Sequence, residues 1–508
     1  MLLIYPPVAK PSEPPAGLAK LSGALKAHGV RHRVVDANIE GLLYQLGSAS
    51  SRPQEGTDTW TRRSLRNLPQ NLSLLRDLHS YRSLDRYKRA VKDVNRALEF
   101  SSGASGARAG LADFQQTGLS PVRSADLIYA AEHPEKNLFF PYFRDRLSAL
   151  FEESQPSVVG FSLNYLSQAL TAFSMIGHVK KILPGAAIIL GGGLVTSWMQ
   201  GPFWSNPFHG LADHLVAGPG EYKLLSLLAA QVTEELPVTP DYMPFRTREY
   251  IAPGFILPYS ASSGCYWKKC SFCPENAEDN PYRAVPTDRV VSDLNKLVGE
   301  TRPVIVHLLD NAVSASLMES LPENPPGAPW YGFARISRQL ADLDFCISLR
   351  RSGCVMLKHG LESGDQAVLD RMQKGTDLKT ASSVLKTLKK AGIGAYVYLL
   401  FGTPAETEAG ARKTLDFVTG HGEEIGFLNL AIFNMPVSAA VSGDFDTSSF
   451  YEGDLSLYTD FSHPTRWDRR SVRKFLEEEF KRNAVVASIL RKDPPVFTSN
   501  HAPFFLMG

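Results

Sequence analysis

The sequence predicts an α/β protein: a doubly wound, Rossmann-like domain, then a partial (β/α)6 barrel of the TIM type and a helical C-terminal tail. Two observations support this. Short apolar strands alternate with amphipathic helices in two separate series, and a proline-rich stretch at 235–258 divides the series. Strands that alternate with helices over short links pair in parallel. We therefore expect domains at 1–235 and 255–440, and a tail at 441–508.

The first domain begins with an apolar strand and a helix that carries leucines on one face and ends at Gly29. An insertion at about 45–140 interrupts the pattern. It is rich in Arg and Ser, has a flexible patch at 101–110, and is expected to form helices. The expected elements of this domain are strands Leu2–Tyr5, Val34–Asp36, Val158–Phe161, Ala187–Leu190 and His214–Ala217, and helices around 18–25 and Ala169–Ile182.

The second series supplies six strands, with helical patterns between them such as Leu378–Ala391 before Gly392. In barrels of this kind the chemistry sits at the carboxyl ends of the strands. The tail shows one helix, about Ser471–Leu490. The expected strands are Leu257–Ser260, Val304–Leu309, Tyr331–Ala334, Cys354–His359, Gly394–Phe401 and Phe427–Ile432.

Charge is nearly balanced, with 54 basic and 52 acidic residues, so the composition gives no reason to expect a nucleic-acid partner. One stretch, 62–96, is locally basic. It is either the solvated face of one or two helices or a surface for nucleic acid or an acidic partner. No apolar run is long enough to span a bilayer, and Pro6-Pro7 interrupts the short amino-terminal one. We expect a cytoplasmic protein without a signal peptide or a membrane partner.

Three of the five cysteines, Cys265, Cys270 and Cys273, crowd into nine positions directly after the first strand of the second series. Thiolates select zinc or iron–sulfur clusters. Structural zinc wants four protein ligands, and no histidine lies nearby. Three thiolates would leave one iron of a cubane cluster open to an exogenous ligand. A cluster is our hypothesis, with zinc or packing cysteines as the alternative; we expect Cys346 and Cys354 to be packing residues.

The segment 263–274, SGCYWKKCSFCP, resembles the signature loop of the radical S-adenosylmethionine (radical SAM) superfamily, and the resemblance extends over about 255–440. It implies that Cys265, Cys270 and Cys273 bind one 4Fe–4S cluster, and that Phe272 packs against the adenine of S-adenosylmethionine. The gaps between these cysteines are four and two residues, whereas three and two are usual in the superfamily.

Later segments match the same superfamily in the same order: HLLDN at 307–311, WYGFAR at 330–335, GCVMLKHGLESG at 353–364, VLDRMQKG at 368–375 and YLLFGTPAET at 398–407. The resemblance implies that Asp310 and Asn311 lie where the methionyl amino group is held, and that Glu362 binds the ribose. It also implies that Arg335 ends the third strand and that the Gly402 turn lies beside the adenine. Each has an ordinary structural alternative: a cap or surface ion pair for Glu362, an ion pair inside the barrel for Arg335, and a helix start for Glu406.

The first domain resembles the cobalamin-binding domain often fused ahead of this barrel, over about 1–45 and 135–235. The resemblance rests on YPP at 5–7, DANIE at 36–40, GFSLNY at 160–165, LGGG at 190–193 and GPGE at 218–221. It implies that glycines let cobalamin approach the backbone. The motif with a cobalt-ligating histidine is absent. A domain that binds nothing, with a bare tight turn and a helix start, is the alternative. The glycines concerned are Gly191, Gly192, Gly218 and Gly220.

The resemblance implies reductive cleavage of S-adenosylmethionine to a 5′-deoxyadenosyl radical, with electrons from an external donor such as flavodoxin or ferredoxin. If cobalamin binds, the expected reaction is methyl transfer to an unactivated carbon of a small-molecule substrate. The alternatives are a cobalamin-independent radical rearrangement, cyclisation or oxidation, and, in another class, a non-catalytic metal-binding redox sensor.

Overall fold

The computed structural model describes residues 1–50, 57–103, 106–229, 238–246, 249–441, 445–450, 452–495 and 498–507. The chain divides into two compact units. Unit 1 comprises Met1–Phe255, Tyr451–Leu457 and Pro495–Thr498, and unit 2 comprises Ile256–Phe450, Tyr458–Pro494 and Ser499–Gly508. Residues of the tail therefore belong to both units.

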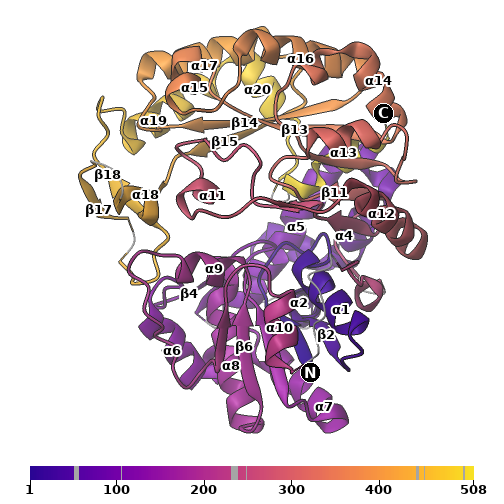
Figure 1. The fold of residues 1–508 in the computed structure, drawn as a ribbon. Helices are drawn as coiled ribbons and strands as arrows, with labels where there is room; N and C mark the ends of the chain where they lie inside the picture. Colours follow the sequence, from indigo (N-terminus) through magenta and orange to yellow (C-terminus); the bar gives the residue numbers. More distant parts are fainter. Residues whose placement is uncertain are drawn as a thin grey trace. The chain divides into compact units, whose positions relative to one another are not determined.

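Unit 1 is built on a five-stranded sheet in the order β2-β1-β5-β6-β7, and all four strand pairs are parallel (Figure 1). Strand β1, which lies between β2 and β5, is buried along its whole length, as expected for a strand covered on both faces. The doubly wound fold that the sequence predicts is confirmed. The order is the flavodoxin-like one, which places a topological switch point between β1 and β5.

Unit 1 contains these elements: β1 Leu2–Tyr5, α1 Ala16–Ala27, β2 Arg33–Asp36, α2 Ala37–Ser50, α3 Thr59–Arg66, α4 Leu68–Leu75, η1 Leu78–Arg82, α5 Leu84–Ser102, β3 Ala107–Ala109, β4 Phe114–Gln116, α6 Ser124–Glu132, η3 Pro134–Lys136, α7 Phe140–Ser154, β5 Val158–Ser162, α8 Leu166–Ile182, β6 Ala187–Gly191, α9 Gly193–Met199, β7 His214–Val216, α10 Glu221–Leu227 and η4 Met243–Phe245.

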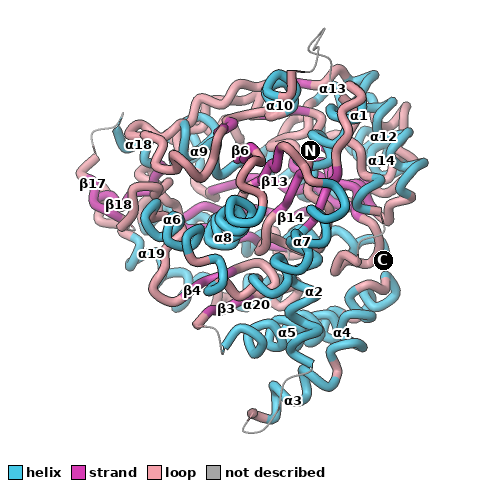
Figure 2. The backbone as a smooth tube through the Cα atoms, turned by 90° about the horizontal axis from the view of Figure 1, so that it is seen from below, coloured by secondary structure: helices cyan, strands magenta, loops and turns pink. Residues whose placement is uncertain are grey.

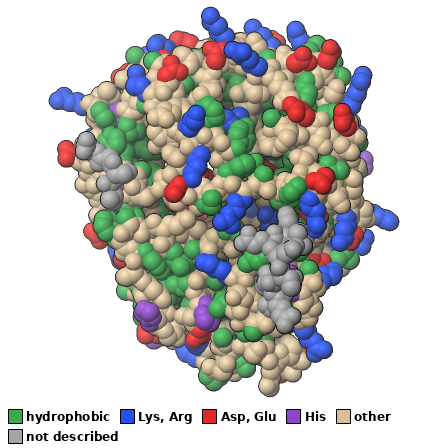
Figure 3. Space-filling model, viewed as in Figure 1, with side chains coloured by type: hydrophobic (Ala, Val, Ile, Leu, Met, Phe, Trp, Pro, Cys, Tyr) green, Lys and Arg blue, Asp and Glu red, His purple; other side chains and the backbone are tan. Residues whose placement is uncertain are grey.

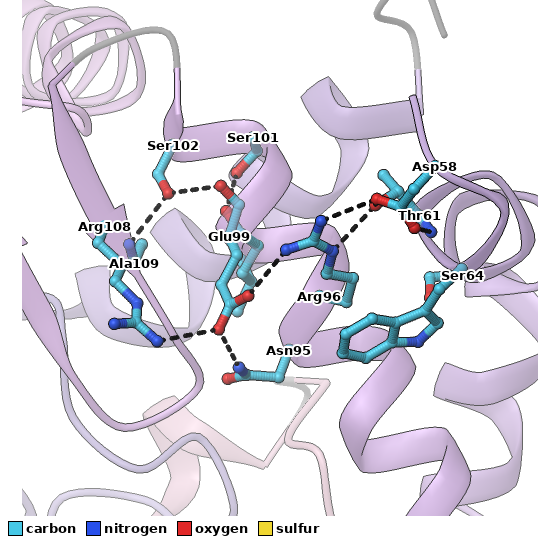
Figure 4. A network of polar contacts seen from close by, with 12 residues as sticks. Asp58, Thr61, Ser64, Asn95, Arg96, Glu99, Ser101, Ser102, Arg108 and Ala109 are labelled. Carbon is cyan, nitrogen blue, oxygen red and sulfur yellow. Dashed lines mark hydrogen bonds and ion pairs between the residues drawn. The ribbon is translucent and has the colours of Figure 1, made fainter. Parts of the chain in front are cut away.

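The insertion forms the helices α3, α4 and α5, which pack together (Figure 2), and also an antiparallel hairpin, β3–β4, that the sequence does not predict. Residues 104–105 of the patch at 101–110 lie outside the described residues. A polar network centred on Arg96 joins these elements (Figure 4). Arg96 donates to Thr61 Oγ1 at 2.9 Å and pairs with Asp58 and Glu99, while Arg108 of β3 pairs with Glu99.

Two further arginines of the basic stretch have partners within unit 1. Arg63 pairs with the buried Asp93, and Arg76 donates to the carbonyl oxygens of Glu249 and Tyr250. On the face of the molecule in Figure 3, basic and acidic side chains are interspersed. The contacts of Arg63 and Arg76 favour the interpretation of the stretch as helix surface with local ion pairs.

Unit 2 is built on six parallel strands in the order β15-β14-β13-β12-β11-β8, so each strand lies beside its neighbours in the series (Figure 1). This is the arrangement of the partial barrel that the sequence predicts. Local signals explain the agreement. Helix α16 begins where the Asp377 side chain accepts from Thr380 N, and it ends at Gly392, whose φ is +74°.

Unit 2 contains these elements: β8 Ile256–Tyr259, β9 Ser262–Ser263, α11 Pro274–Ala277, β10 Arg283–Ala284, α12 Thr287–Thr301, β11 Ile305–Leu308, α13 Ala315–Ser320, β12 Trp330–Phe333, η5 Gln339–Ala341, α14 Leu343–Arg351, β13 Cys354–Glu362, α15 Gln366–Arg371, α16 Leu378–Ala391, β14 Gly394–Phe401, α17 Glu408–Gly420, β15 Phe427–Ile432, β16 Met435–Pro436, α18 Val437–Val441, β17 Thr447–Ser449, β18 Tyr458–Phe461, α19 Arg469–Phe475, the π-helical turn η6 Leu476–Phe480 and α20 Ala484–Leu490; the 3₁₀ segment η7, Thr498–Leu506, follows at the end of the chain.

The tail differs from the single helix expected at 471–490. Helix α19 passes into the π-helical turn η6, and a new helix, α20, starts at Ala484. The break occurs because the Asn483 side chain accepts from Val485 N and Val486 N and so caps the second helix. A small antiparallel sheet, β16-β18-β17, precedes these helices and was not predicted. Its strands are too short to give a clear alternating pattern.

None of the helices that the structure describes combines the length and apolarity needed to cross a membrane.

Helix packing in unit 1 provides a test of the fold. A Cβ added to Gly177 of α8 would lie 1.8 Å from the carbonyl oxygen of Ala131 at α6, whereas one added to Gly47 of α2 would meet nothing within 4 Å. We expect Gly177→Ala to lower the free energy of unfolding by about 2–3 kcal/mol. Gly47→Ala, the matched control, should raise it by about 0.5–1 kcal/mol. Urea denaturation measures both, and equal effects would contradict the described packing of α6 on α8.

Candidate functional site

The three clustered cysteines lie on a loop at the carboxyl end of β8, between the two-residue strand β9 and the short helix α11. β9 pairs with β10, which closes the base of this loop. Gly264 has a φ of +69°, and a Cβ there would lie 2.5 Å from Pro281 O, so glycine fits both the conformation and the space. We call residues 264–273 the cysteine loop.

Within the cysteine loop, Cys270 is buried and Cys265 and Cys273 are partly exposed. Burial raises the pKa of Cys270 and Cys273, and the negative charge of Cys265 adds to the rise at both. The three thiols therefore share one electrostatic environment. Among the described residues, no group of three or more His, Cys, Asp or Glu side chains is placed to hold a single metal ion.

The donor set favours a cluster over a single ion. Thiolates of a tetrahedral zinc site lie about 4 Å from one another. A cubane binds each thiolate at a different iron, so its ligands form a wider triangle and can number three. The cysteine loop supplies three thiols and no histidine, so its donor set fits a cubane with one iron left to another ligand.

The cysteine loop docks on the segment that links α15 to α16. Trp267 Nε1 donates to Gln373 O at 2.9 Å, and Ser271 N donates to Met372 O at 3.1 Å. Gly375 faces the indole ring of Trp267, where a Cβ would come within 2.1 Å of a ring carbon. The segment 368–375, which the sequence analysis singled out, is thus the platform of the loop.

Phe272, expected beside the adenine, packs against this platform. The buried side chains of Val368, Leu369 and Met372 form a small core there, with Phe272, Leu378 and Ala405 packed on it. The ammonium group of Lys374 lies 5.5 Å from the centroid of the Phe272 ring. The ring is therefore fixed by the platform on the side that this core covers.

Two cations, Lys374 and Arg335, approach the cysteine loop. Lys374 Nζ pairs with Glu362 Oε1 at 2.8 Å, and both side chains are almost buried. Arg335 donates to Lys374 O at 2.5 Å, and its guanidinium lies 4.1 Å from the centroid of the Trp267 ring. The positive charges of both residues lower the pKa of Cys270 and so oppose the effect of burial. Lys374 is not among the site residues expected from the sequence; its only signal there is its place in segment 368–375.

Glu362 lies at the end of β13, where the register with β14 shifts, and its backbone has a φ of +68°. That conformation is unusual for a residue other than glycine and is frequent at functional sites. Lys374 occupies one carboxylate oxygen, and no described residue donates to Oε2. The structure thus brings two of the expected site residues, Glu362 and Arg335, to the cysteine loop.

Asp310 and Asn311 follow β11 and hold the stem of the cysteine loop. Buried Asp310 accepts from Ala261 N at 3.1 Å and from Ser262 Oγ at 2.5 Å. Asn311 Nδ2 donates to Gly264 O at 3.1 Å. Both residues therefore lie against the loop, in contact with its backbone and stem.

The sheet also carries a buried basic pair that the sequence did not single out. Lys358 of β13 lies 3.0 Å from His307 Nε2 of β11, and the His307 ring stacks on Tyr331 of β12. The lysine is held among aromatic rings, 5.1 Å from the centroid of Tyr331 and 4.6 Å from that of Phe333. These polar groups face each other across three adjacent strands.

The turn after β14 is anchored by a buried carboxyl group. Gly402 has a φ of +77°, and its N–H donates to Glu406 Oε2 at 2.6 Å. Trp467 Nε1 from the tail donates to the same oxygen at 2.9 Å, while Oε1 has no partner among the described residues. Glu406, which follows Thr403 in this turn, therefore anchors the turn through these two hydrogen bonds, whereas the sequence suggested only that it starts a helix.

In unit 1, the glycines expected near cobalamin lie at the carboxyl edge of the sheet. Gly192 has a φ of +112°, and a Cβ there would lie 2.4 Å from Leu163 O, so packing within the domain already requires glycine. A Cβ on Gly191 would lie 3.2 Å from Val216 O. Gly218 has a φ of +72° and open space beside it, and Gly220 precedes α10. We call these four positions the glycine edge of unit 1. They fit a tight turn at the end of the sheet with or without a bound ligand.

Comparisons with known proteins agree with this geometry. Residues 259–418 match the model of the radical SAM superfamily, which confirms the resemblance inferred from the cysteine loop. Enzymes of this superfamily use a 4Fe–4S cluster and S-adenosylmethionine. The matched range begins at the end of β8 and ends within α17, so it contains the cysteine loop, its platform and the Gly402 turn.

Two relatives are similar in sequence. An uncharacterized protein of Methanopyrus kandleri is 24% identical over 197 residues, which is 35% of this chain and 37% of that protein. An uncharacterized methyltransferase of Pyrococcus horikoshii is 21% identical over 311 residues, which is 53% of this chain and 66% of that protein.

Among solved structures, the radical SAM methyltransferase TsrM from Kitasatospora setae, with cobalamin and a [4Fe–4S] cluster bound, has a TM-score of 0.52 at 14% identity. The match covers 85% of this chain and 72% of that one. A second TsrM structure, with tryptophan and an S-adenosylmethionine analogue, also gives 0.52. This likeness shows a shared fold.

The anchor of the Gly402 turn gives a pH-dependent prediction. Burial raises the pKa of Glu406 to about 7. Because this is above the value of about 4.5 in an unfolded chain, ionisation costs stability as pH rises, by roughly 2–3 kcal/mol between pH 5 and pH 8. Glu406→Gln keeps an acceptor for both N–H groups and removes the titration. We expect the variant to gain stability relative to the wild type over this pH range.

Urea denaturation of the two proteins at pH 5, 6, 7 and 8 measures this difference. Glu408→Gln, an exposed glutamate two residues along, is the control for the loss of a charge. A difference between wild type and Glu406→Gln that does not change with pH would contradict the buried ionisable group.

Proposed function

We propose that this chain, which contains a radical SAM domain at 259–418, binds one 4Fe–4S cluster through Cys265, Cys270 and Cys273 and acts as a radical SAM enzyme. The observation that carries the proposal is the docked cysteine loop: three thiols at the carboxyl end of the first barrel strand, with two cations beside them. When bound, the cluster and S-adenosylmethionine supply a 5′-deoxyadenosyl radical by one-electron reduction, with electrons from a donor such as flavodoxin or ferredoxin.

The residues around the cysteine loop have distinct tasks in this proposal. Lys374 and Arg335 lower the pKa of Cys270 and so favour its thiolate form against the effect of burial. Glu362 offers Oε2 to the ribose hydroxyls of S-adenosylmethionine, and Gly402 gives the adenine close access to the backbone. Asp310 and Asn311 keep the stem of the loop in place and lie where the methionyl amino group is expected.

The finer proposal is cobalamin-dependent methyl transfer to an unactivated carbon of a small molecule. Three observations support it: the doubly wound sheet of unit 1 with its switch point, the shared fold with TsrM over 85% of the chain, and the relative named as a methyltransferase. The glycine edge of unit 1 is the place for the cofactor. A cobalamin-independent radical reaction is the second candidate, because packing alone accounts for the glycine at 192.

Metal analysis tests both levels of the proposal. Protein reconstituted anaerobically with iron and sulfide should hold ~4 irons per chain and form 5′-deoxyadenosine from S-adenosylmethionine under reduction. Exposure to hydroxocobalamin, followed by gel filtration, should leave about one cobalt per chain. Iron without retained cobalt would favour the second candidate, and zinc without iron would contradict the first proposal.

The ligand assignment predicts a sharp difference among cysteines. Replacing Cys265, Cys270 or Cys273 with Ala should abolish 5′-deoxyadenosine formation and remove most of the iron, because each thiolate binds a separate iron. Cys346→Ala is the matched control, since Cys346 is a buried cysteine of α14 outside the loop and should retain iron and activity. Iron analysis and chromatography of the products measure both. Full activity in a loop variant would refute its ligand role.

The role of Glu362 gives a second test. Glu362→Gln should weaken S-adenosylmethionine binding about tenfold or more while the iron content stays unchanged, because a charge-assisted acceptor is lost. Glu423→Gln is the control, since Glu423 is also paired with a lysine, Lys389, but on the exposed surface. Isothermal titration of the reconstituted proteins measures affinity. Unchanged binding in Glu362→Gln would count against the ribose contact.

A further inference from the structure

A cavity of about 790 Å³ lies in unit 2 where the tail meets the ends of β14 and β15. We infer that it is the substrate cavity, and that it takes a flat, apolar molecule that carries an anionic group, a carboxylate or a phosphate. The inference rests on the proposed function, whose substrate class it names. Its volume is in the usual range of small-molecule sites, roughly 300–1,000 Å³.

The position of the cavity suits a substrate of barrel chemistry. Gly402, which follows β14, and residues 432–435, which run from the last residue of β15 to the first of β16, form one side of it. The chemistry of such barrels takes place at the carboxyl ends of the strands. The tail supplies the opposite side, from the β17–β18 hairpin and from residues 462–473.

Aromatic rings give the cavity its preference for a flat apolar body. Phe433, Phe450, Phe461 and Trp467 all line it, together with Ile432 and Met435. Phe433 and Phe461 meet edge to face, with ring centroids 5.8 Å apart. Rings arranged in this way offer flat surfaces against which another ring can pack.

Arginines give the cavity its preference for an anion. Arg466, Arg469, Arg470 and Arg473 line it with three aspartates, so the basic side chains outnumber the acidic ones. Arg469 is engaged: it donates to Asn434 Oδ1 at 2.6 Å and its guanidinium lies 4.8 Å from the centroid of Phe450. No ion pair within the described residues involves Arg466 or Arg473, and both are exposed toward solvent. A guanidinium presents paired N–H donors that match a carboxylate or a phosphate.

Two of the three aspartates accept hydrogen bonds from backbone amides and keep their negative charge, so the four arginines leave a net positive charge of one. Asp468 Oδ1 accepts from Ser471 N at 2.8 Å as the cap of α19, and Asp460 accepts from Phe461 N at 3.0 Å. The third, Asp446, is exposed at the hairpin. Arg470 and Arg473 are three residues apart on α19 and so project from one face of that helix.

The aromatic wall is held rigidly to the barrel. Trp467 Nε1 donates to buried Glu406, and His463 Nε2 lies 2.8 Å from Thr403 O. Both bonds fasten the tail to the turn that begins at Gly402. A preorganised wall loses little conformational entropy when a ligand binds, and this favours binding in the cavity.

Three matched probes test the inference with anaerobically reconstituted full-length protein: 2-naphthoate, 2-naphthyl phosphate and the neutral 2-naphthamide. We expect at least one of the two anions to bind at least tenfold more tightly than the amide, by isothermal titration. The anion that does so identifies the charged group, a carboxylate or a phosphate. Equal binding of all three probes, or tighter binding of the amide, would overturn the inference.

Variants locate the binding. The double variant Arg466→Gln/Arg473→Gln should reduce the preference for the anion to less than threefold, whereas Arg482→Gln, an exposed arginine of the tail that does not line the cavity, should retain it. Arg466→Lys/Arg473→Lys keeps the charge and should retain a partial preference, which covers the case in which the glutamine variant does not fold. An undiminished preference in the glutamine double variant would place the anion elsewhere.

The two levels of the proposal fail in different ways. Wild-type protein that cleaves S-adenosylmethionine but binds no naphthyl anion in preference to the amide overturns the cavity assignment alone. Wild-type protein that shows the anion preference but forms no 5′-deoxyadenosine overturns the proposed function and, with it, the cavity's assignment to a radical reaction.

Discussion

The docking of the cysteine loop on segment 368–375 is the contact on which the rest of the site depends. The loop has little regular structure of its own, because β9 spans two residues and α11 spans four. Its shape is instead fixed by Trp267 and Ser271, which donate to carbonyl oxygens of Gln373 and Met372, and by the ring of Phe272 on the small core beneath. Without this platform the distances between the three thiols would not be fixed. A cluster with three protein ligands requires thiols at fixed distances from one another.

The platform also brings charge to the loop. Lys374 enters a nearly buried position, which is tolerated because Glu362 pairs with it. Arg335 is held by the carbonyl oxygen of Lys374 and by the face of Trp267. At Cys270, burial raises the pKa and favours the neutral thiol, and these cations lower the pKa and favour the thiolate. One compact arrangement of loop, lysine, glutamate and arginine therefore serves structure and electrostatics together.

The sequence was sufficient for what is local and periodic. Strands such as β14 and β15 are apolar runs between clear stop signals, and α16 has an aspartate cap and a terminal glycine, so their bounds followed from the pattern. The contact of Trp267 with Gly375 joins positions that no local pattern connects, so the role of Lys374 was not visible. The hairpin β17–β18 and the break before α20 were missed for a similar reason, since they depend on short strands and on a single capping side chain.

The tail is hydrogen-bonded to the turn at Gly402, which is the turn expected beside the adenine. The indole N–H of Trp467 and the N–H of Gly402 donate to one oxygen of Glu406, so the wall of the cavity and the turn share a single acceptor. A ligand that displaced the Trp467 ring would weaken one of these bonds and leave a buried carboxyl group with fewer donors, which is costly in an apolar setting. Occupancy of the cavity is therefore coupled to the position of the Gly402 turn for a ligand that moves the Trp467 ring, whereas a ligand that leaves the ring in place binds without disturbing the turn.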